Sequence, residues 1–276
     1  MAHTSRTGCA TSIEARLAYT RHTLGFDHPN TLSLANNVAH VLRQQGGYDQ
    51  ARRLDEDTLA RRRETLGSDH PSTLSSANNL VVDLAATGAY IRARRLAEDT
   101  LTRRRQVLGD SHPNTLSSAN NLARLLRALG EAEQACRLAE DTLMRRREVL
   151  GADHPSTLSS ANNLVVDLAA TGAHIRARRL AEDTLTRRRQ VLSDCHPDTL
   201  SSANNLAHVL RLQGEYEEAR RLDEVTLRHR ERVLGKDHPD TLSSVNNLMI
   251  DICELGDNER ARHLEERIGR SDRCGQ

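Results

Sequence analysis

Apolar residues recur at steps of three and four along most of this chain, which is the spacing of one face of an α-helix. The first apolar stripe consists of Leu32, Ala35, Val38, Ala39 and Leu42. The next stripe consists of Ala51, Leu54 and Leu59. Pro29 suits the first turn of a helix, where a missing N–H costs no hydrogen bond, and Gly46 interrupts the pattern. The pattern therefore predicts one helix from Pro29 to just before Gly46 and a second that ends near Leu66.

This pair of helices recurs six times at a step of 42 residues. The step is marked by a His-Pro-x-Thr-Leu phrase, whose prolines are Pro29, Pro71, Pro113, Pro155, Pro197 and Pro239. Adjacent asparagines keep the same step, beginning with Asn36 and Asn37. The links between helices are short, so neighbouring helices must run antiparallel, and one helical hairpin of this size cannot bury its apolar faces alone. The repeats are therefore expected to stack into an all-α solenoid.

Composition restricts the core and the partners. The 276 residues include no Trp, one Phe and four Tyr, so the core must be filled by Leu, Val and Ala. The chain has 39 basic and 38 acidic residues. It therefore lacks the excess of basic charge that is typical of nucleic-acid-binding proteins. The five cysteines have no paired or CxxC spacing, which argues against a disulfide framework and a zinc site. No signal peptide or long apolar run occurs, so we expect a cytoplasmic protein with no cofactor and no membrane partner.

The repeated phrases resemble the tetratricopeptide repeat, in the 42-residue form of kinesin light chains and of bacterial and fungal repeat arrays. They read LG-x-DHP-x-TL-x-S-x-NNL and then G-x-Y-x-x-AR-x-L, the latter best seen at residues 46–54 and 214–222. The resemblance implies a right-handed superhelix of antiparallel helix pairs and a non-catalytic binding scaffold. Bacterial arrays of this kind are often the sensor region of a larger regulator with an NTPase switch, but no GxxxxGK[ST] phosphate loop occurs in this chain.

The register of the repeats divides the chain into three segments. Residues 1–25 contain a lone helix that resembles the second helix of a repeat, which makes the chain look like part of a longer protein. Residues 26–268 form the array of six repeats, and the second helix of the last repeat has the polar outer face expected of a terminal cap. Residues 269–276 are polar and are expected to form a disordered tail.

A longer period of 84 residues is visible, because residues 69–108 and 153–192 differ only at Tyr90 and His174. The resemblance implies that the face of each first helix opposite the core lines a concave groove. At one position on that face the six repeats carry His40, Val82, Arg124, Val166, His208 and Ile250. Three residues later they carry Arg43, Ala85, Arg127, Ala169, Arg211 and Cys253. Basic pairs from odd repeats thus alternate with small or apolar residues from even repeats, which favours an extended ligand with acidic side chains.

The paired asparagines admit two interpretations. A side-chain amide offers donors and acceptors that match the main chain of an extended peptide, and it can equally bond the neighbouring repeat. We interpret one Asn of each pair as a bond between repeats and the other as facing the groove, a role that the resemblance assigns to Asn37 more readily than to Asn36. The predicted ligand-binding residues are Asn37, His40, Arg43, Asn79, Asn121, Arg124, Arg127, Asn163, Asn205, His208, Arg211 and Asn247.

Three other features are interpreted as structural. The His-Pro histidines occur once per repeat, too far apart to share a metal ion, and are expected to be loop residues. The RRR runs at 61–63, 103–105, 145–147 and 187–189 are expected to form a solvated outer face, so that substitution of Arg104 should hardly affect binding. An Asp four residues before each run, such as Asp57, is expected to pair with its first Arg. The repeated serines have no His-Asp partner in the sequence, which argues against an enzyme.

Two function classes remain. The first is a protein-protein interaction scaffold that binds an extended acidic peptide or partner segment in its groove. The second is a structural array that self-associates through its uncovered ends, which the near-identical double repeat and the partial first repeat favour.

Overall fold

The computed structural model describes the backbone of residues 3–269 and the side chains of residues 13–264. Within that range all of the regular structure is helical, in thirteen helices, which confirms the predicted all-α solenoid of helix pairs. The lone helix at the N-terminus is α1 (His3–Leu24). No described helix is long and apolar enough to cross a membrane. The predicted disordered tail lies outside the described residues, apart from its first residue, which ends the last helix.

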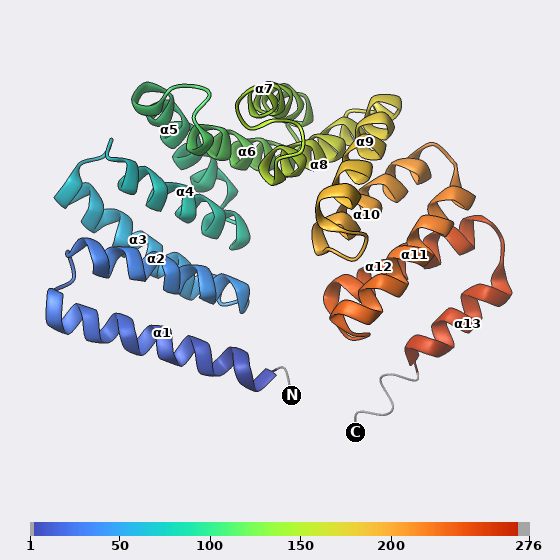
Figure 1. Cartoon of the computed structure of the whole chain (residues 1–276), viewed down its shortest axis with the longest axis horizontal. Helices are drawn as coiled ribbons and strands as arrows, with labels where there is room; N and C mark the ends of the chain where they lie inside the picture. Colours follow the sequence, from blue (N-terminus) through green and yellow to red (C-terminus); the bar gives the residue numbers. More distant parts are fainter. Residues whose placement is uncertain (1–2, 270–276) are drawn as a thin grey trace. The chain divides into compact units, whose positions relative to one another are not determined.

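Each repeat contributes an A helix and a B helix that follow one another along the chain (Figure 1). The A helices are α2 (Pro29–Gln44), α4 (Pro71–Ala86), α6 (Pro113–Ala128), α8 (Pro155–Ala170), α10 (Pro197–Leu212) and α12 (Pro239–Glu254). The B helices are α3 (Tyr48–Leu66), α5 (Tyr90–Leu108), α7 (Ala132–Leu150), α9 (His174–Leu192), α11 (Tyr216–Leu234) and α13 (Asn258–Gly269). The sequence predicts this arrangement, in which six helix pairs follow one lone helix.

The His-Pro phrase starts every A helix. In α2 the proline is the first helical residue, and the side chain of His28 accepts a hydrogen bond from the backbone N–H of Asn30 at 3.2 Å. The other five A helices begin in the same way. A side chain that accepts from an N–H of the first turn satisfies a donor that has no partner inside the helix. The predicted structural role of these histidines is therefore confirmed, with helix capping as its physical basis.

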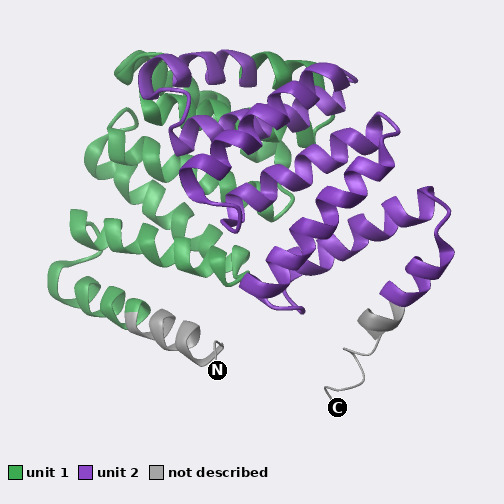
Figure 2. Cartoon of the chain, turned by 45° about the vertical axis from the view of Figure 1, so that its right-hand side comes forward, with its two compact units in different colours: residues 1–138 green, residues 139–276 purple. Residues whose placement is uncertain are grey.

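The predicted apolar stripes form the core. Leu32, Ala35 and Val38 of α2 are buried, and so are Ala51 and Leu59 of α3. The chain consists of two compact units, residues 1–138 and 139–276, coloured separately in Figure 2. Within each unit a helix packs against the next one, and A helices of successive repeats also touch, as α4 and α6 do in the first unit and α8 and α10 do in the second.

The middle arginine of each RRR run is buried, which contradicts the predicted solvated face. Arg104 is 3% exposed and its guanidinium donates to the backbone oxygen of Asn114 at 2.7 Å and to Ser118 Oγ at 2.8 Å, both in the next A helix. It follows the buried Thr100 and Leu101 by four and three residues, so it lies on the same helix face. The equivalent buried arginines are Arg62, Arg146, Arg188 and Arg230.

The first arginine of each run behaves as predicted. Arg61 Nε lies 2.9 Å from Asp57, four residues earlier, and the same spacing pairs Arg103 with Asp99 at 2.9 Å. Arg145 and Arg187 have the corresponding partners. Each run therefore combines an exposed ion pair within one helix and a buried bond to the next repeat.

Candidate functional site

A cavity of about 490 Å³ lies in the first unit, over the C-terminal halves of α4 and α6. This volume falls within the range of about 300–1,000 Å³ that is common for ligand sites. Its apolar part comes from α4, through Val81, Val82 and Ala85. Its polar part comes from α6, and includes three of the predicted ligand-binding residues: Asn121, Arg124 and Arg127. Side chains predicted to act together are thus brought to one place.

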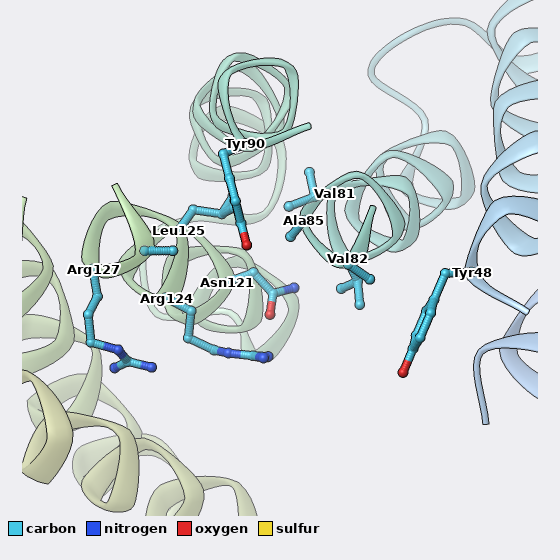
Figure 3. A pocket seen from close by; sticks show the side chains of 11 residues that line it. Tyr48, Val81, Val82, Ala85, Tyr90, Asn121, Arg124, Leu125 and Arg127 are labelled. Atoms are coloured by element: carbon cyan, nitrogen blue, oxygen red, sulfur yellow. The ribbon is translucent and has the colours of Figure 1, made fainter. Parts of the chain in front are cut away.

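Two tyrosines complete the cavity, and neither was among the predicted ligand-binding residues. Tyr48 is the first residue of α3 and Tyr90 the first residue of α5, and they are 43% and 39% exposed. In the view of Figure 3, Asn121 lies between the two rings and Arg124 lies below them. Neither tyrosine hydroxyl has a hydrogen-bond partner among the described residues. A chain with only five aromatic residues therefore places two of them around one cavity, with their hydroxyls free to bond a ligand.

Arg124 is a cavity cation without a charge partner in the described part of the chain. Its side chain is exposed and has no ion pair or hydrogen bond within the described residues. Arg127 is partly buried and lies on the same helix, one turn further on. Figure 3 shows the Arg124 guanidinium extending below Asn121. A free guanidinium beside an apolar floor can bind a carboxylate through charge-assisted hydrogen bonds.

The asparagine pairs bond successive repeats, which is one of the two roles that the sequence left open. The first Asn of a pair contacts the next A helix: Asn78 Oδ1 accepts from Ser118 Oγ at 3.0 Å. The second Asn bonds back to the preceding repeat: Asn121 Nδ2 donates to Asn78 Oδ1 at 3.1 Å, and Asn247 Nδ2 donates to Asn204 Oδ1 at 2.6 Å. An amide that donates one N–H retains a second N–H and its oxygen. Asn121 is therefore held in place by Asn78 while keeping bonding capacity toward the cavity.

Arg43 and Arg211, two predicted groove residues, are instead bonded to buried carboxylates. Arg43 Nη1 lies 2.8 Å from Asp55 and 2.8 Å from Asp83, and both aspartate side chains are completely buried. Arg211 Nη1 lies 2.7 Å from Asp223 and 3.1 Å from Asp251, again with both carboxylates buried. These guanidinium charges are compensated within the protein. The structure gives them a role in joining repeats that the sequence interpretation did not anticipate.

Burial perturbs these carboxyl groups. Loss of hydration, followed by the neighbouring Asp83, raises the pKa of Asp55 to about 8, and the bond to Arg43 offsets only part of this. Burial likewise raises the pKa of Asp223 to about 7, where Arg211 opposes the shift. One guanidinium shared by two buried carboxylates cannot neutralise both, so a proton is held more tightly in the folded protein than in water.

The remaining predicted residues are distributed over the other A helices. Asn37 and His40 lie exposed on α2, where His40 Nε2 is 3.1 Å from the Gln44 amide nitrogen. Asn79 and Asn163 are partly buried on α4 and α8. In the second unit, Asn205 and His208 lie on α10 beside Arg211, with Asn205 partly buried and His208 exposed.

Family models described as tetratricopeptide repeat match residues 30–106, 115–156, 157–198 and 199–240. The chain therefore belongs to the tetratricopeptide repeat family. It is of the kinesin-light-chain-like type that the 42-residue phrases predicted. Proteins of this family are generally non-catalytic, and their solenoid fold commonly mediates protein-protein interactions. No curated protein sequence matches the chain.

Solved structures support the same assignment. A Podosopora anserina protein described as a kinesin light chain with nearly identical TPR-like repeats is 30% identical, with a TM-score of 0.63 over 74% of this chain and 97% of that one. BtubC from P. vanneervenii is 20% identical, with a TM-score of 0.66 over 83% and 92% of the two chains. NprR in complex with its cognate peptide NprX is 14% identical, with a TM-score of 0.64 over 94% and 72%. The last two are similar in fold alone.

Proposed function

We propose that this protein is a non-catalytic scaffold that binds an extended, acidic segment of a partner protein along its A helices, with the cavity of α4 and α6 as the anchoring site. The observation that carries the proposal is the uncompensated Arg124 guanidinium at the edge of an apolar, tyrosine-flanked cavity. An apolar side chain would occupy the floor formed by Val81 and Val82, and a neighbouring carboxylate would bond Arg124.

An extended conformation of the ligand matches the polar groups that line the cavity. The side chains of an extended peptide alternate between opposite sides, so a carboxylate on one side and an apolar group on the next can reach different walls of the cavity. Asn121 can bond the main chain between them, independently of the ligand sequence. The proposal also gains support from NprR, a protein of the same fold described with a bound peptide.

The charge requirement is local. The whole chain has a formal net charge of +1, so a general attraction to acidic molecules is not expected. Specificity for acidic side chains must come from the groups in the groove, and the interaction must weaken with salt because an open groove is screened.

The test is calorimetry with two synthetic peptides that alternate leucine with glutamate or leucine with glutamine. These peptides have the same shape and hydrogen-bonding main chain and differ in charge. We expect the glutamate peptide to bind at least about tenfold more tightly at low salt, and the difference to shrink at physiological salt. Equal affinity for both peptides would show that the groove does not select acidic side chains. Growth in molecular mass with protein concentration, measured by light scattering, would instead favour the self-associating array.

A further inference from the structure

The two nearly identical segments of the chain differ at a single residue, and that residue lies on the cavity wall. Residues 69–108 and 153–192 are otherwise the same, with Tyr90 in the first and His174 in the second. Tyr90 lines the cavity in the first unit. The one position at which the copies diverge is therefore a position that would contact a ligand.

The local structure around the two residues is the same. The residue before Tyr90 has φ −80° and ψ 50°, and the residue before His174 has φ −78° and ψ 49°. The bond between repeats is also reproduced, because Ser202 Oγ donates to Asn162 Oδ1 at 3.0 Å, the distance found between Ser118 and Asn78. His174 thus occupies the place in the second unit that Tyr90 occupies in the first.

A second exchange accompanies the first. The position of Arg124 is taken by His208 on α10, while the apolar floor is retained through Val166 and Ala169 of α8. The counterpart of Asn121 is Asn205, whose Nδ2 lies 3.4 Å from the backbone oxygen of Asn162. The tyrosine and free arginine of the first unit are therefore replaced by two imidazoles in the second, on helices that pack together.

The charges around the two imidazoles are mainly positive or already compensated. Burial, followed by the charges of Arg211 and His174, lowers the pKa of His208. Asp223 of α11 and Asp251 of α12 approach this region, but both are bonded to Arg211. Neither imidazole is hydrogen-bonded to a carboxylate within the described residues.

Charged side chains of α9 and of the start of α11 bond one another. Arg178 of α9 binds Glu215 at 2.6 Å and Glu218 at 3.1 Å, at the start of α11. The α8 positions that correspond to the cavity floor are apolar. An acidic ligand side chain is thus the group best suited to compensate two protonated imidazoles at this place.

We propose that His174 and His208 form a second carboxylate-binding subsite, which binds an acidic side chain of the partner segment more tightly as the pH falls below neutral. The inference rests on the proposed function, and it distinguishes the two units: Tyr90 and Arg124 give a subsite whose charge is constant, whereas the imidazoles give one whose charge is set by pH. Binding of the carboxylate would be coupled to uptake of protons.

The test is calorimetry of the leucine-glutamate peptide with the full chain at about pH 5.5 and pH 7.5, where imidazoles change charge and glutamates stay ionised. Repeating each titration in buffers of different ionisation enthalpy gives the number of protons taken up. His174→Tyr is the informative variant, because it recreates residues 69–108, which fold in the first unit. His22→Tyr is the matched control, since it removes an exposed imidazole from α1, outside the groove.

We expect wild type and His22→Tyr to bind about tenfold more tightly at the lower pH, with proton uptake, and His174→Tyr to lose most of both effects. Tyr90→His should add pH dependence to the first unit. Binding that is independent of pH, or a pH dependence unchanged in His174→Tyr, would overturn this inference while leaving the scaffold function intact. Absence of binding at both pH values would overturn the proposed function and the inference with it.

Discussion

The guanidinium of Arg43 lies 2.8 Å from Asp83, a completely buried carboxylate on the A helix of the following repeat. Arg211 and Asp251 repeat this arrangement in the second unit. The arginines belong to odd repeats and the aspartates to even repeats, so each bond joins two unlike repeats. This relationship gives a physical reason for the 84-residue period: a partly buried arginine in one repeat pairs with a completely buried acid in the next.

Removing the arginine is expected to destabilise the protein. In Arg43→Met the side chain keeps its length, but Asp55 and Asp83 lose the cation that they share. Asp83 Oδ2 is already buried without a hydrogen-bond partner among the described residues. Breaking a buried ion pair in this way costs about 3–5 kcal/mol. Urea denaturation followed by circular dichroism should show the loss. The control is Arg124→Met, which removes an exposed, unpaired arginine and should change stability by less than about 0.5 kcal/mol. Similar midpoints for the two variants would contradict the assigned role.

Stability should fall as the pH rises from about 4 to about 8, because of Asp55. Its pKa is raised to about 8 in the folded protein by burial, above the value of about 3.9 for an unfolded chain. A group whose folded pKa is raised contributes stability that is complete below the unfolded pKa and is lost as the pH passes through the folded pKa. In Asp55→Asn this contribution is absent, so the variant should gain on wild type by up to about 4 kcal/mol between pH 5 and pH 8.

The measurement is the free energy of unfolding in urea at both pH values for wild type and variant. Asp49→Asn, an exposed change on the same helix, is the control and should follow wild type at both. If Asp55→Asn followed wild type in the same way, the carboxyl would not hold a proton in the folded state. Asp223 should give a similar window in the second unit, ending near pH 7.

The sequence was sufficient for the fold, because helix boundaries, caps and apolar stripes are local and recur six times. The sequence did not reveal the ion pairs of Arg43 and Arg211, because their aspartate partners on the next A helix lie far away along the chain. Arg43 lies 40 residues from Asp83, and helical spacing alone places it on the groove face. The missing signal was present two residues earlier in the repeat: the repeats carry Val41, Asp83, Leu125, Asp167, Val209 and Asp251 at one position, an alternation opposite in phase to the arginines.

The error at Arg104 has a related origin. A run of three arginines was interpreted as one exposed surface, although residues of a run point in different directions around a helix. The apolar stripe of the B helix, extended by one further turn, would have placed Arg104 on the buried face. The tyrosines of the cavity could likewise have been found, because Tyr48, Tyr90 and Tyr216 each begin a B helix.

Ligand affinity is expected to depend on Arg124. A charge-assisted hydrogen bond contributes about 1.5–3 kcal/mol, so Arg124→Ala should weaken binding of the leucine-glutamate peptide by about one to two orders of magnitude. The control is Arg95→Ala, which removes an exposed α5 arginine that does not line the cavity. Calorimetry at two salt concentrations should show a large loss for the first variant and little change for the second. A larger loss for Arg95→Ala would place the binding surface on the B helices.

Cys195 and His229 occupy the positions of an ion pair found in other repeats. Arg61 lies 2.9 Å from Asp27, and Arg103 lies 2.7 Å from Asp69, each pair separated by 34 residues. At the same separation, Cys195 Sγ lies 2.9 Å from His229 Nδ1. A thiol and an imidazole thus replace a carboxylate and a guanidinium, and both members of the pair have changed together.

Restoring the charged pair should show that these two positions are coupled. The double variant Cys195→Asp/His229→Arg can form the ion pair of the other repeats, whereas each single variant introduces one charged group without that partner. Exposed pairs contribute about 0.2–1 kcal/mol, so a double-mutant cycle in urea should give a favourable coupling energy of this size at low salt. The coupling should decrease at high salt, because both side chains are accessible to solvent. Additive effects of the two substitutions at low salt would show that the positions do not interact in the folded protein.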